Sequence, residues 1–377
     1  MSRFRDMDDS HSRMRPIEST ITWARAHERH LSALSLAGGF AFDNYTFGRI
    51  DRPMTQAVFI VYLLVAGTAI GVLHMLESRG EDRKLAERTR AILISVAQFA
   101  LGCLLSGFCV FYIRSAAIGA SWPFLLFMAA IFIGNEVFRR YHARLVFSAL
   151  LFFFALYSYA ILLVPVVLGR IGTMPFLLSG AIAVVLFFVY MRLLAFLGHD
   201  RYRLARAQIA LGVAVITVLF NAFYFVKVFP PLPLVLSDAG VYHAVKRVGG
   251  HYEVKGEDEP ARWRALFGVF PVLHVGPDEK LYIYSAVFAP YRLTTRIVHH
   301  WEWRDPKTGD WTMQQTVRFT IHGGRDEGYR VFSYRSHPRS GQWRVNIATI
   351  DGRAIGRVRF SVEDVPSPPK LGTRLLK

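Results

Sequence analysis

Between about His30 and Pro230 the chain is a series of apolar runs separated by short basic loops. Six of these runs are strong, and each is close to the roughly 20 residues that an α-helix needs to cross about 30 Å of hydrocarbon. Backbone amide and carbonyl groups inside a bilayer must bond within their own segment, so these runs are expected to be helices. The six runs are Thr55–Leu76, Ile92–Ile113, Ala117–Phe138, Leu145–Leu168, Met174–Leu197 and Ala207–Phe229.

A weaker apolar run, His30–Phe47, precedes these six and contains Asp43. The polar residues 1–29 before it lack the apolar core of a cleavable signal peptide, so we expect them to form a cytoplasmic segment. If the weak run also crosses the membrane, 18 Arg and Lys lie on the side of the N-terminus and 4 lie on the other side. Because cytoplasmic loops carry the excess of basic residues, the sequence predicts seven spans, with the N-terminus inside and the C-terminal region outside the cytoplasm.

Composition agrees with a membrane location and argues against two classes of function. Only 19% of the residues are charged, against about a quarter in a soluble chain. Most Arg and Lys before residue 230 lie in the short loops, where basic residues orient a membrane protein and bind anionic headgroups, so nucleic-acid binding is not expected. Cys103 and Cys109 share one apolar run but point to different sides of a helix, so neither a disulfide nor a metal site is expected.

After the Pro-rich exit PPLPL, the pattern changes to period-two alternation with turn residues between the segments. Such alternation, repeated about every ten residues, predicts a sandwich of short strands. We expect an extracytoplasmic β domain over residues 231–364, one short helix near Asp258–Phe267, and a disordered Pro-rich tail over residues 365–377. The predicted strands are LYIYSAVF, RIVHHWEW, TMQQTVRFTI, YRVFSYR, QWRVNIAT and RVRFSV. The predicted fold is therefore an α-helical membrane bundle of about seven spans at 30–230, followed by an all-β, Ig-like sandwich.

Several motifs occur in the order found in a bacterial family. They are the PPLPL exit followed by Val241, Tyr242 and His243, the His-x-Trp pattern of IVHHWEW, the segment GYRVFSYR, the closing strands GQWRVNIATIDGRAIGRVRFSV, and the early stretch GGFAFDN. With these motifs the chain resembles the DUF2914 family of bacterial membrane proteins, whose domain often follows a run of transmembrane helices. The resemblance implies the architecture and the cytoplasmic (inner) membrane of a bacterium. It implies no catalytic activity.

The segment RIVHHWEW is the most unusual part of the β region. On a strand, His299 and Trp301 point to one face, while His300 and Glu302 point to the other. Tryptophan beside imidazole can stack on a sugar ring, and an arginine can hold an anionic group. The candidate face for a ligand or partner consists of His299, Trp301, Arg330, Ser333 and Arg344. The structural alternative, which is commoner for such residues, is that Trp301 anchors the sandwich core and His299 bonds to a neighbouring strand.

Two polar residues are well placed to lie inside the membrane. They are Asp43 in the first run and Asn221 in the last. Polar side chains are costly in lipid, so they are candidates for an ion path or a relay. Hydrogen bonding between helices is the structural alternative.

No nucleotide-binding, hydrolase, metalloprotease or dithiol motif occurs, so no catalytic residue, cofactor or metal is expected. The leading hypothesis is a non-enzymatic envelope protein whose helices anchor it, with a homo-oligomer as one option, and whose β domain binds a protein or glycan partner. The alternative is a transporter or a lipid-modifying enzyme with an accessory β domain. A polar cavity between the helices would favour the alternative, and a dry bundle packed with Leu and Phe would favour the envelope protein.

Overall fold

The architecture comes from a computed structural model, which describes residues 38, 40–45, 47–79, 83–138, 141, 144–197, 199–257, 270–367 and 370–376. Residues 40–45 are helical. Most of the predicted first crossing, the polar segment before it and the predicted helix at Asp258–Phe267 lie outside the described residues. Two compact units are present, 1–48 and 49–377, and the second contains both the six long helices and the β domain.

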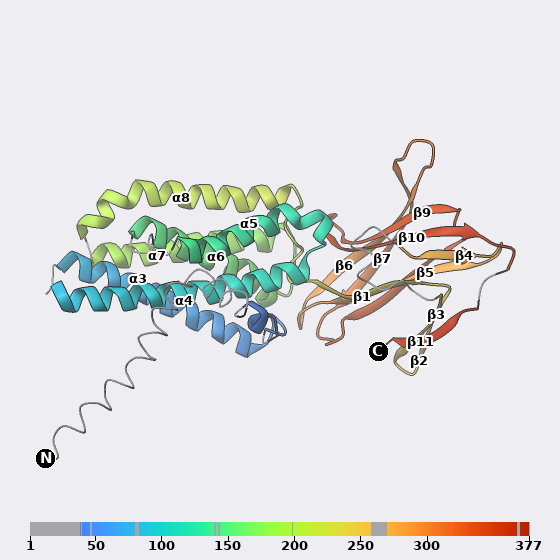
Figure 1. Cartoon of the computed structure of the whole chain (residues 1–377), viewed down its shortest axis with the longest axis horizontal. Coiled ribbons are helices and arrows are strands. Elements are labelled where there is room, and N and C mark those ends of the chain that lie inside the picture. The colour runs from blue at the N-terminus through green and yellow to red at the C-terminus, as the bar shows by residue number, and fades with distance from the viewer. Residues whose placement is uncertain are drawn as a thin grey trace, which may run out of the picture. The chain divides into compact units, whose positions relative to one another are not determined.

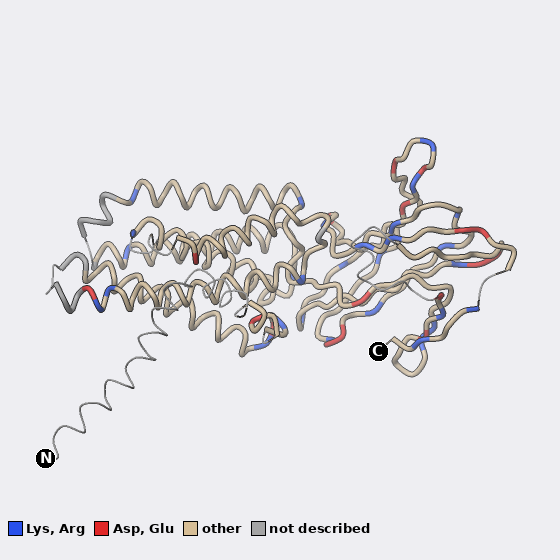
Figure 2. Tube along the Cα trace, viewed as in Figure 1, with Lys and Arg blue, Asp and Glu red and all other residues tan. Residues whose placement is uncertain are grey.

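Among the residues that the structure describes, six long helices form the bundle (Figure 1), and each is long and apolar enough to cross a membrane. Their bounds agree closely with the predicted spans, because the apolar runs that enter lipid are the parts that must be helical. Charged residues gather toward the helix ends (Figure 2). The chain is thus a multi-pass membrane protein. The helices are α3 (Pro53–Arg79), α4 (Arg83–Ser115), α5 (Ile118–Val137), α6 (Leu145–Leu168), α7 (Thr173–Leu197) and α8 (His199–Phe225).

Aromatic rings pack in the interior of the bundle near the end of α8. The fully buried Phe124 lies 4.8 Å from Tyr112 and 4.6 Å from Phe229, measured between ring centroids. Phe220, also fully buried, lies 4.7 Å from Tyr157. Tilted and edge-on rings at such distances pack densely. Phe229 lies beyond the end of α8, so the last predicted run ends its helix four residues early and then folds back onto the bundle.

The described residues of the β domain form eleven strands in three sheets. A three-stranded sheet has the order β1-β5-β8, a five-stranded sheet has the order β4-β10-β9-β6-β7, and a second three-stranded sheet has the order β11-β3-β2. All pairs are antiparallel except β4 with β10. The strands are β1 (Val235–Tyr242), β2 (Ala244–Val248), β3 (His251–Gly256), β4 (Val272–Val275), β5 (Lys280–Phe288), β6 (Thr294–Arg304), β7 (Trp311–His322), β8 (Tyr329–Ser336), β9 (Gly341–Thr349), β10 (Ala354–Asp364) and β11 (Gly372–Leu376).

Alternation along β5 shows how the sheets are layered. Leu281 and Ile283 face the five-stranded sheet, where they pack in one core with Trp301. Tyr284 points the other way and packs with Tyr252 of β3 in a separate core. The predicted sandwich is therefore present, and the small β11-β3-β2 sheet covers the outer side of its three-stranded layer.

The prediction of a disordered tail was wrong, because the chain after the prolines forms β11. Leu376 is buried in the core beside Val254 of β3, whereas Leu375 is 64% exposed. Backbone pairing with β3 runs from Gly372 to Leu376. Only five residues pair here, so the alternation is too short to stand out in the sequence.

Turns of the β domain contact the ends of the helices. The Asp51 carboxylate, just before α3, accepts a 2.9 Å hydrogen bond from the backbone nitrogen of Tyr291 in the β5–β6 turn. The Arg353 guanidinium, in the β9–β10 turn, stacks 3.4 Å from the ring centroid of Tyr224 in the last turn of α8. Ile171, in the α6–α7 loop, packs against the sandwich core. The start of α3, the end of α8 and the α6–α7 loop therefore contact the β domain.

The role of β11 can be tested with two adjacent leucines. Leu376→Ala should lower the free energy of unfolding of the β domain by about 2 kcal/mol or more, because it removes a buried side chain. Leu375→Ala should change it by less than about 0.5 kcal/mol, because that side chain faces water. Urea unfolding of the full chain in detergent, followed by tryptophan fluorescence, measures both. Equal effects of the two substitutions would contradict the assigned register.

Candidate functional site

The structure places the centre of the predicted ligand face inside the sandwich. His299 and Trp301 both lie on β6 and are 0% exposed. The His299 ring lies between two hydroxyl groups, with Nε2 2.9 Å from Ser285 Oγ and Nδ1 2.9 Å from Ser333 Oγ. Trp301 Nε1 donates a 2.9 Å hydrogen bond to Ser333 Oγ as well. The structural alternative for this face is therefore the arrangement found, and these three residues offer no surface to a ligand.

The buried network suits a neutral imidazole. Each serine hydroxyl can donate or accept, so both ring nitrogens of neutral His299 are satisfied. Burial, helped by the nearby His300, lowers the pKa of His299 from 6.5 to about 3. Ser285 and Ser333 belong to β5 and β8, so the network ties the two sheets of the sandwich together.

The remaining two residues of the predicted face lie apart from each other. Arg330, on β8, pairs with Glu327 and donates a 3.1 Å hydrogen bond to the Gly250 carbonyl. Arg344, on β9, lies on the outer side of the five-stranded sheet and pairs with Glu302. The alternation rule assigned the two faces of β6 correctly, but the face that we chose for a ligand is the one turned toward the core.

The outer side of the five-stranded sheet is crowded with arginines, and we call it the arginine face. On β6 it carries the even-numbered residues, opposite in direction to His299 and Trp301. Lys and Arg recur along these strands in Figure 2. The pairing registers place Arg296, Arg304, Arg318, Arg344, Arg357 and Arg359 on this side.

One carboxylate organises the middle of the arginine face. Glu302 accepts hydrogen bonds from Arg344 Nε and, at 3.0 Å, from Asn346 Nδ2. The Asn346 side-chain oxygen in turn accepts a 2.5 Å bond from Arg357 Nε. The Arg344 guanidinium also stacks 4.3 Å from the ring of Trp311. A single acid therefore positions two arginines and an indole on one surface.

A β-bulge brings Trp311 to this surface. The pairing of β6 with β7 shifts between Trp301 and Glu302, so that one more residue is accommodated on β7. Trp311 consequently pairs with Arg304 instead of turning toward the core. The sequence shows Arg344 on β9 and the alternating Arg357 and Arg359 of β10, but nothing in it marks the bulge.

Positive charge exceeds negative charge on the arginine face. The pKa of Arg357 is lowered by burial first, and then by the neighbouring cations Arg344 and Arg359; Glu302 opposes the shift. Cations that lower one another's pKa are stabilised by an added anion. The face is therefore suited to carboxylate, sulfate or phosphate groups, which guanidinium groups bind in a bidentate manner.

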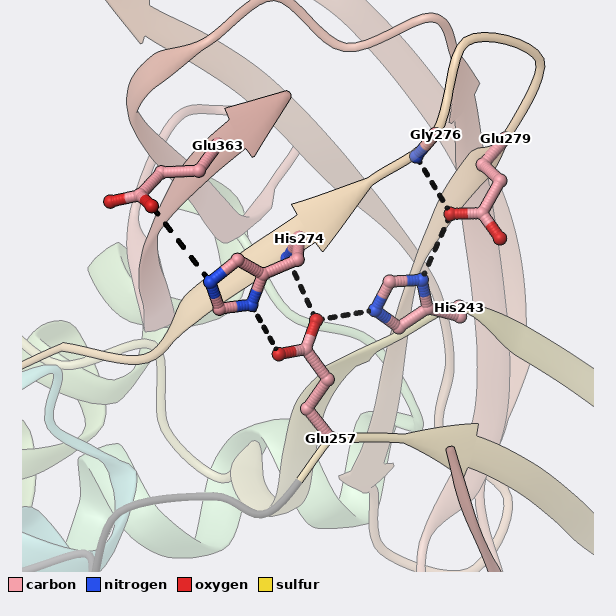
Figure 3. A network of polar contacts seen from close by, with 6 residues as sticks. All are labelled: His243, Glu257, His274, Gly276, Glu279 and Glu363. Carbon is pink, nitrogen blue, oxygen red and sulfur yellow. Dashed lines mark hydrogen bonds and ion pairs between the residues drawn. The ribbon is translucent and has the colours of Figure 1, made fainter. Parts of the chain in front are cut away.

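A second polar cluster, built from histidines and glutamates, lies where β1 and β3 end and β5 begins (Figure 3). The Glu257 carboxylate lies between two imidazoles, 2.9 Å from His243 Nε2 and 2.7 Å from His274 Nδ1. It also accepts a 2.7 Å hydrogen bond from the His274 backbone nitrogen. Glu279 lies 3.5 Å from His243 Nδ1, and Glu363 lies 3.8 Å from His274 Nε2.

The hydrogen bonds of the cluster favour the charged forms of His274 and Glu257. The hydrogen bond to Glu257 raises the pKa of His274. Burial opposes ionisation of Glu257, but its hydrogen bonds to His274 and His243 outweigh burial and lower its pKa. Five separate segments supply the residues, so the sequence offers no local signal of this cluster. Within the described parts of the chain, no group of three or more His, Cys, Asp or Glu could hold a metal ion.

The two predicted intramembrane residues, Asp43 and Asn221, belong to different units of the chain. Asn221 donates a 2.8 Å hydrogen bond to the Thr217 carbonyl of its own helix and lies 3.5 Å from the Tyr157 hydroxyl on α6. It thus bonds within the bundle, as the structural alternative expects. Asp43 belongs to the first unit, where its backbone carbonyl accepts a bond from Phe47.

Comparison with protein families gives a match within the β domain. Residues 294–362 match the family described as a protein of unknown function, DUF2914. The chain carries a DUF2914 domain. The matched segment contains β6 to β9 and most of β10, so the DUF2914 domain supplies four strands of the five-stranded sheet, together with β8 of the facing sheet.

Two other comparisons give no information on the function of the DUF2914 domain. No match was found among curated proteins. A structure of Pseudomonas fluorescens alkylpurine DNA glycosylase AlkC, bound to DNA containing an abasic site analog, aligns with 82% of this chain and 99% of that chain. The identity is 9% and the TM-score 0.20, so the likeness carries no argument about fold or activity.

The burial of His299 predicts that the free energy of unfolding falls in acid. The pKa of His299 is lower in the folded chain than in the unfolded chain. Because protons then bind preferentially to the unfolded chain, the folded state loses stability as the pH falls below 6.5. Between pH 7.5 and 5.0 this group should cost about 2 kcal/mol of unfolding free energy. Urea unfolding of the full chain in detergent, compared with His299→Gln, isolates that loss. The same pH dependence in both proteins would show that His299 is not held neutral.

Proposed function

We propose that the chain is a non-enzymatic protein of the bacterial cytoplasmic membrane, and that its β domain lies outside the cytoplasm and binds an anionic protein or glycan partner. The observation that carries the proposal is the arginine face. It gathers six arginines on one side of one sheet. Glu302 holds Arg344 in place, and Asn346 links it to Arg357.

The chemistry of the arginine face fits such a partner. Guanidinium groups bind carboxylate and phosphate through two parallel hydrogen bonds. Trp311 adds an aromatic surface beside Arg344, and sugar rings stack on such surfaces. The sugar-stacking role considered for Trp301 is thus transferred to a tryptophan on the opposite face of the sheet.

The bundle supports an anchoring role in preference to transport or lipid modification. Its interior contains fully buried aromatic rings such as Phe124 and Phe220. A groove of about 710 Å³ between α7 and α8 is lined by apolar residues apart from Arg206 and Thr217. Apolar packing of this kind is what the envelope-protein hypothesis predicts for the bundle, whereas a transporter or a lipid-modifying enzyme would be expected to have a polar cavity. We therefore keep the envelope protein as the leading function.

Loop charges support the orientation even without the first apolar run. The ends of the six helices nearest β1 carry five basic loop residues, namely Arg49, Arg52, Arg114, Arg170 and Lys227. The loops and helix ends on the opposite side carry twelve. Basic residues are retained on the cytoplasmic side, so this difference favours a β domain outside the cytoplasm.

The arginine face can be tested with a defined anionic glycan. We expect the full chain in detergent to bind polygalacturonate, a polymer of uronic acid, more tightly than neutral dextran. Arg357→Gln combined with Arg359→Gln should weaken that binding by more than about tenfold, because two charge-assisted contacts are lost. Microscale thermophoresis at one fixed salt concentration measures the affinities.

A matched control separates a specific face from general attraction. Lys246→Gln combined with Arg247→Gln removes the same charge from exposed positions on β2, in a different sheet. This pair should leave the affinity within about twofold of the unchanged chain. Equal weakening by both pairs, or none by the arginine pair, would rule out the arginine face as the binding surface.

A further inference from the structure

Two turns of the β domain are held at the level of the helix ends. The backbone nitrogen of Tyr291 bonds to Asp51, which lies two residues before the first residue of α3, and Asp51 is held in turn by Arg49 at 2.6 Å. Arg49 also pairs with Asp326 of the β7–β8 turn and stacks 4.8 Å from the ring of Phe288. Tyr291 is thus fixed beside the point where α3 begins its membrane span at Pro53.

The β9–β10 turn is fixed in the same way to another helix. Arg353, only 8% exposed at its side chain, pairs with Asp351 at 2.7 Å and stacks on Tyr224 of α8. The membrane span of α8 ends one residue later, at Phe225. Ile350, at the start of this turn, is therefore held next to the end of a second span.

Both turns expose large apolar side chains at this level. Tyr291 is 65% exposed and Ile350 is 52% exposed. At the adjoining helix ends, Met54 is 74% exposed and Phe225 is 58% exposed. Because the two helix residues must be covered by lipid, side chains at the same level meet the boundary between headgroups and acyl chains.

Three cations lie at or next to these two turns. Arg292 stacks 5.7 Å from the ring of Tyr291, and Arg325 stacks 4.6 Å from the ring of Tyr329. Lys227, just after α8, lies next to Gly352 of the β9–β10 turn. All three cations are exposed. Tyrosine flanked by Arg and Lys is the composition that proteins place in the headgroup layer.

We propose that the β5–β6 and β9–β10 turns enter the headgroup layer of the bilayer that holds the bundle, with Tyr291 and Ile350 at the acyl boundary and Arg292, Arg325 and Lys227 at the lipid phosphates. The β domain is then held by the membrane surface as well as by its contacts with α3 and α8. This proposal does not depend on what the arginine face binds.

The depth of the two turns can be measured with spin labels. The starting protein is the full chain with Cys103→Ala and Cys109→Ala, in nanodiscs that contain phosphatidylglycerol. A nitroxide is attached in turn through Tyr291→Cys, Ile350→Cys and, as the control, Tyr334→Cys. Tyr334 is 49% exposed and pairs with Tyr282, about 20 Å along β5 from the end next to Tyr291.

Collision with oxygen, which concentrates in lipid, is compared with collision with a water-soluble nickel chelate. The ratio of oxygen to nickel accessibility should be several-fold higher at 291 and 350 than at 334. A ratio at either turn equal to that at 334 would overturn the proposal. Low accessibility to both reagents at the turns would overturn it too, because it would mean that protein and not lipid covers them.

Discussion

The sandwich depends on one strand, β6, whose two faces have different roles. Its inward residues Trp301 and His299 bond through Ser333 and Ser285 to the facing sheet. Buried polar groups are costly unless they are fully paired, so this network stabilises one relative placement of the two sheets. With that placement set, the outward residue Glu302 positions arginines on the opposite side. The alternation of side chains along β6 therefore contributes to both the core of the sandwich and the candidate binding surface.

The helices and the central strands could be predicted because each follows a strong local rule. Long apolar runs must be helices in lipid, and β5 to β10 alternate over eight or more residues. Strands β2, β3, β4 and β11 are only four to six residues long, so their alternation is too brief to recognise. Tyr284 shows the consequence, because alternation alone would turn it toward water, whereas the small third sheet covers it.

Only part of the candidate site could be predicted from local patterns in the sequence. The sequence shows that His299 and Trp301 share a face, but which face is buried depends on partners far along the chain, such as Ser333. Arg344 was assigned to the same ligand face as His299, whereas it lies on the opposite side of the sheet beside Glu302. Its partner Trp311 reaches that side through a bulge that no local pattern indicates. The His243–Glu257–His274 cluster depends on tertiary contacts throughout.

The proposed function requires the arginine face of the β domain to lie outside the cytoplasm. The most direct test places one cysteine on the arginine face, with Thr320→Cys in a chain that lacks Cys103 and Cys109. A membrane-impermeant maleimide should label it in intact spheroplasts, while a cysteine introduced by Glu87→Cys near the start of α4 should react only after lysis. Labelling of position 87 alone in intact spheroplasts would place the arginine face in the cytoplasm and contradict the account.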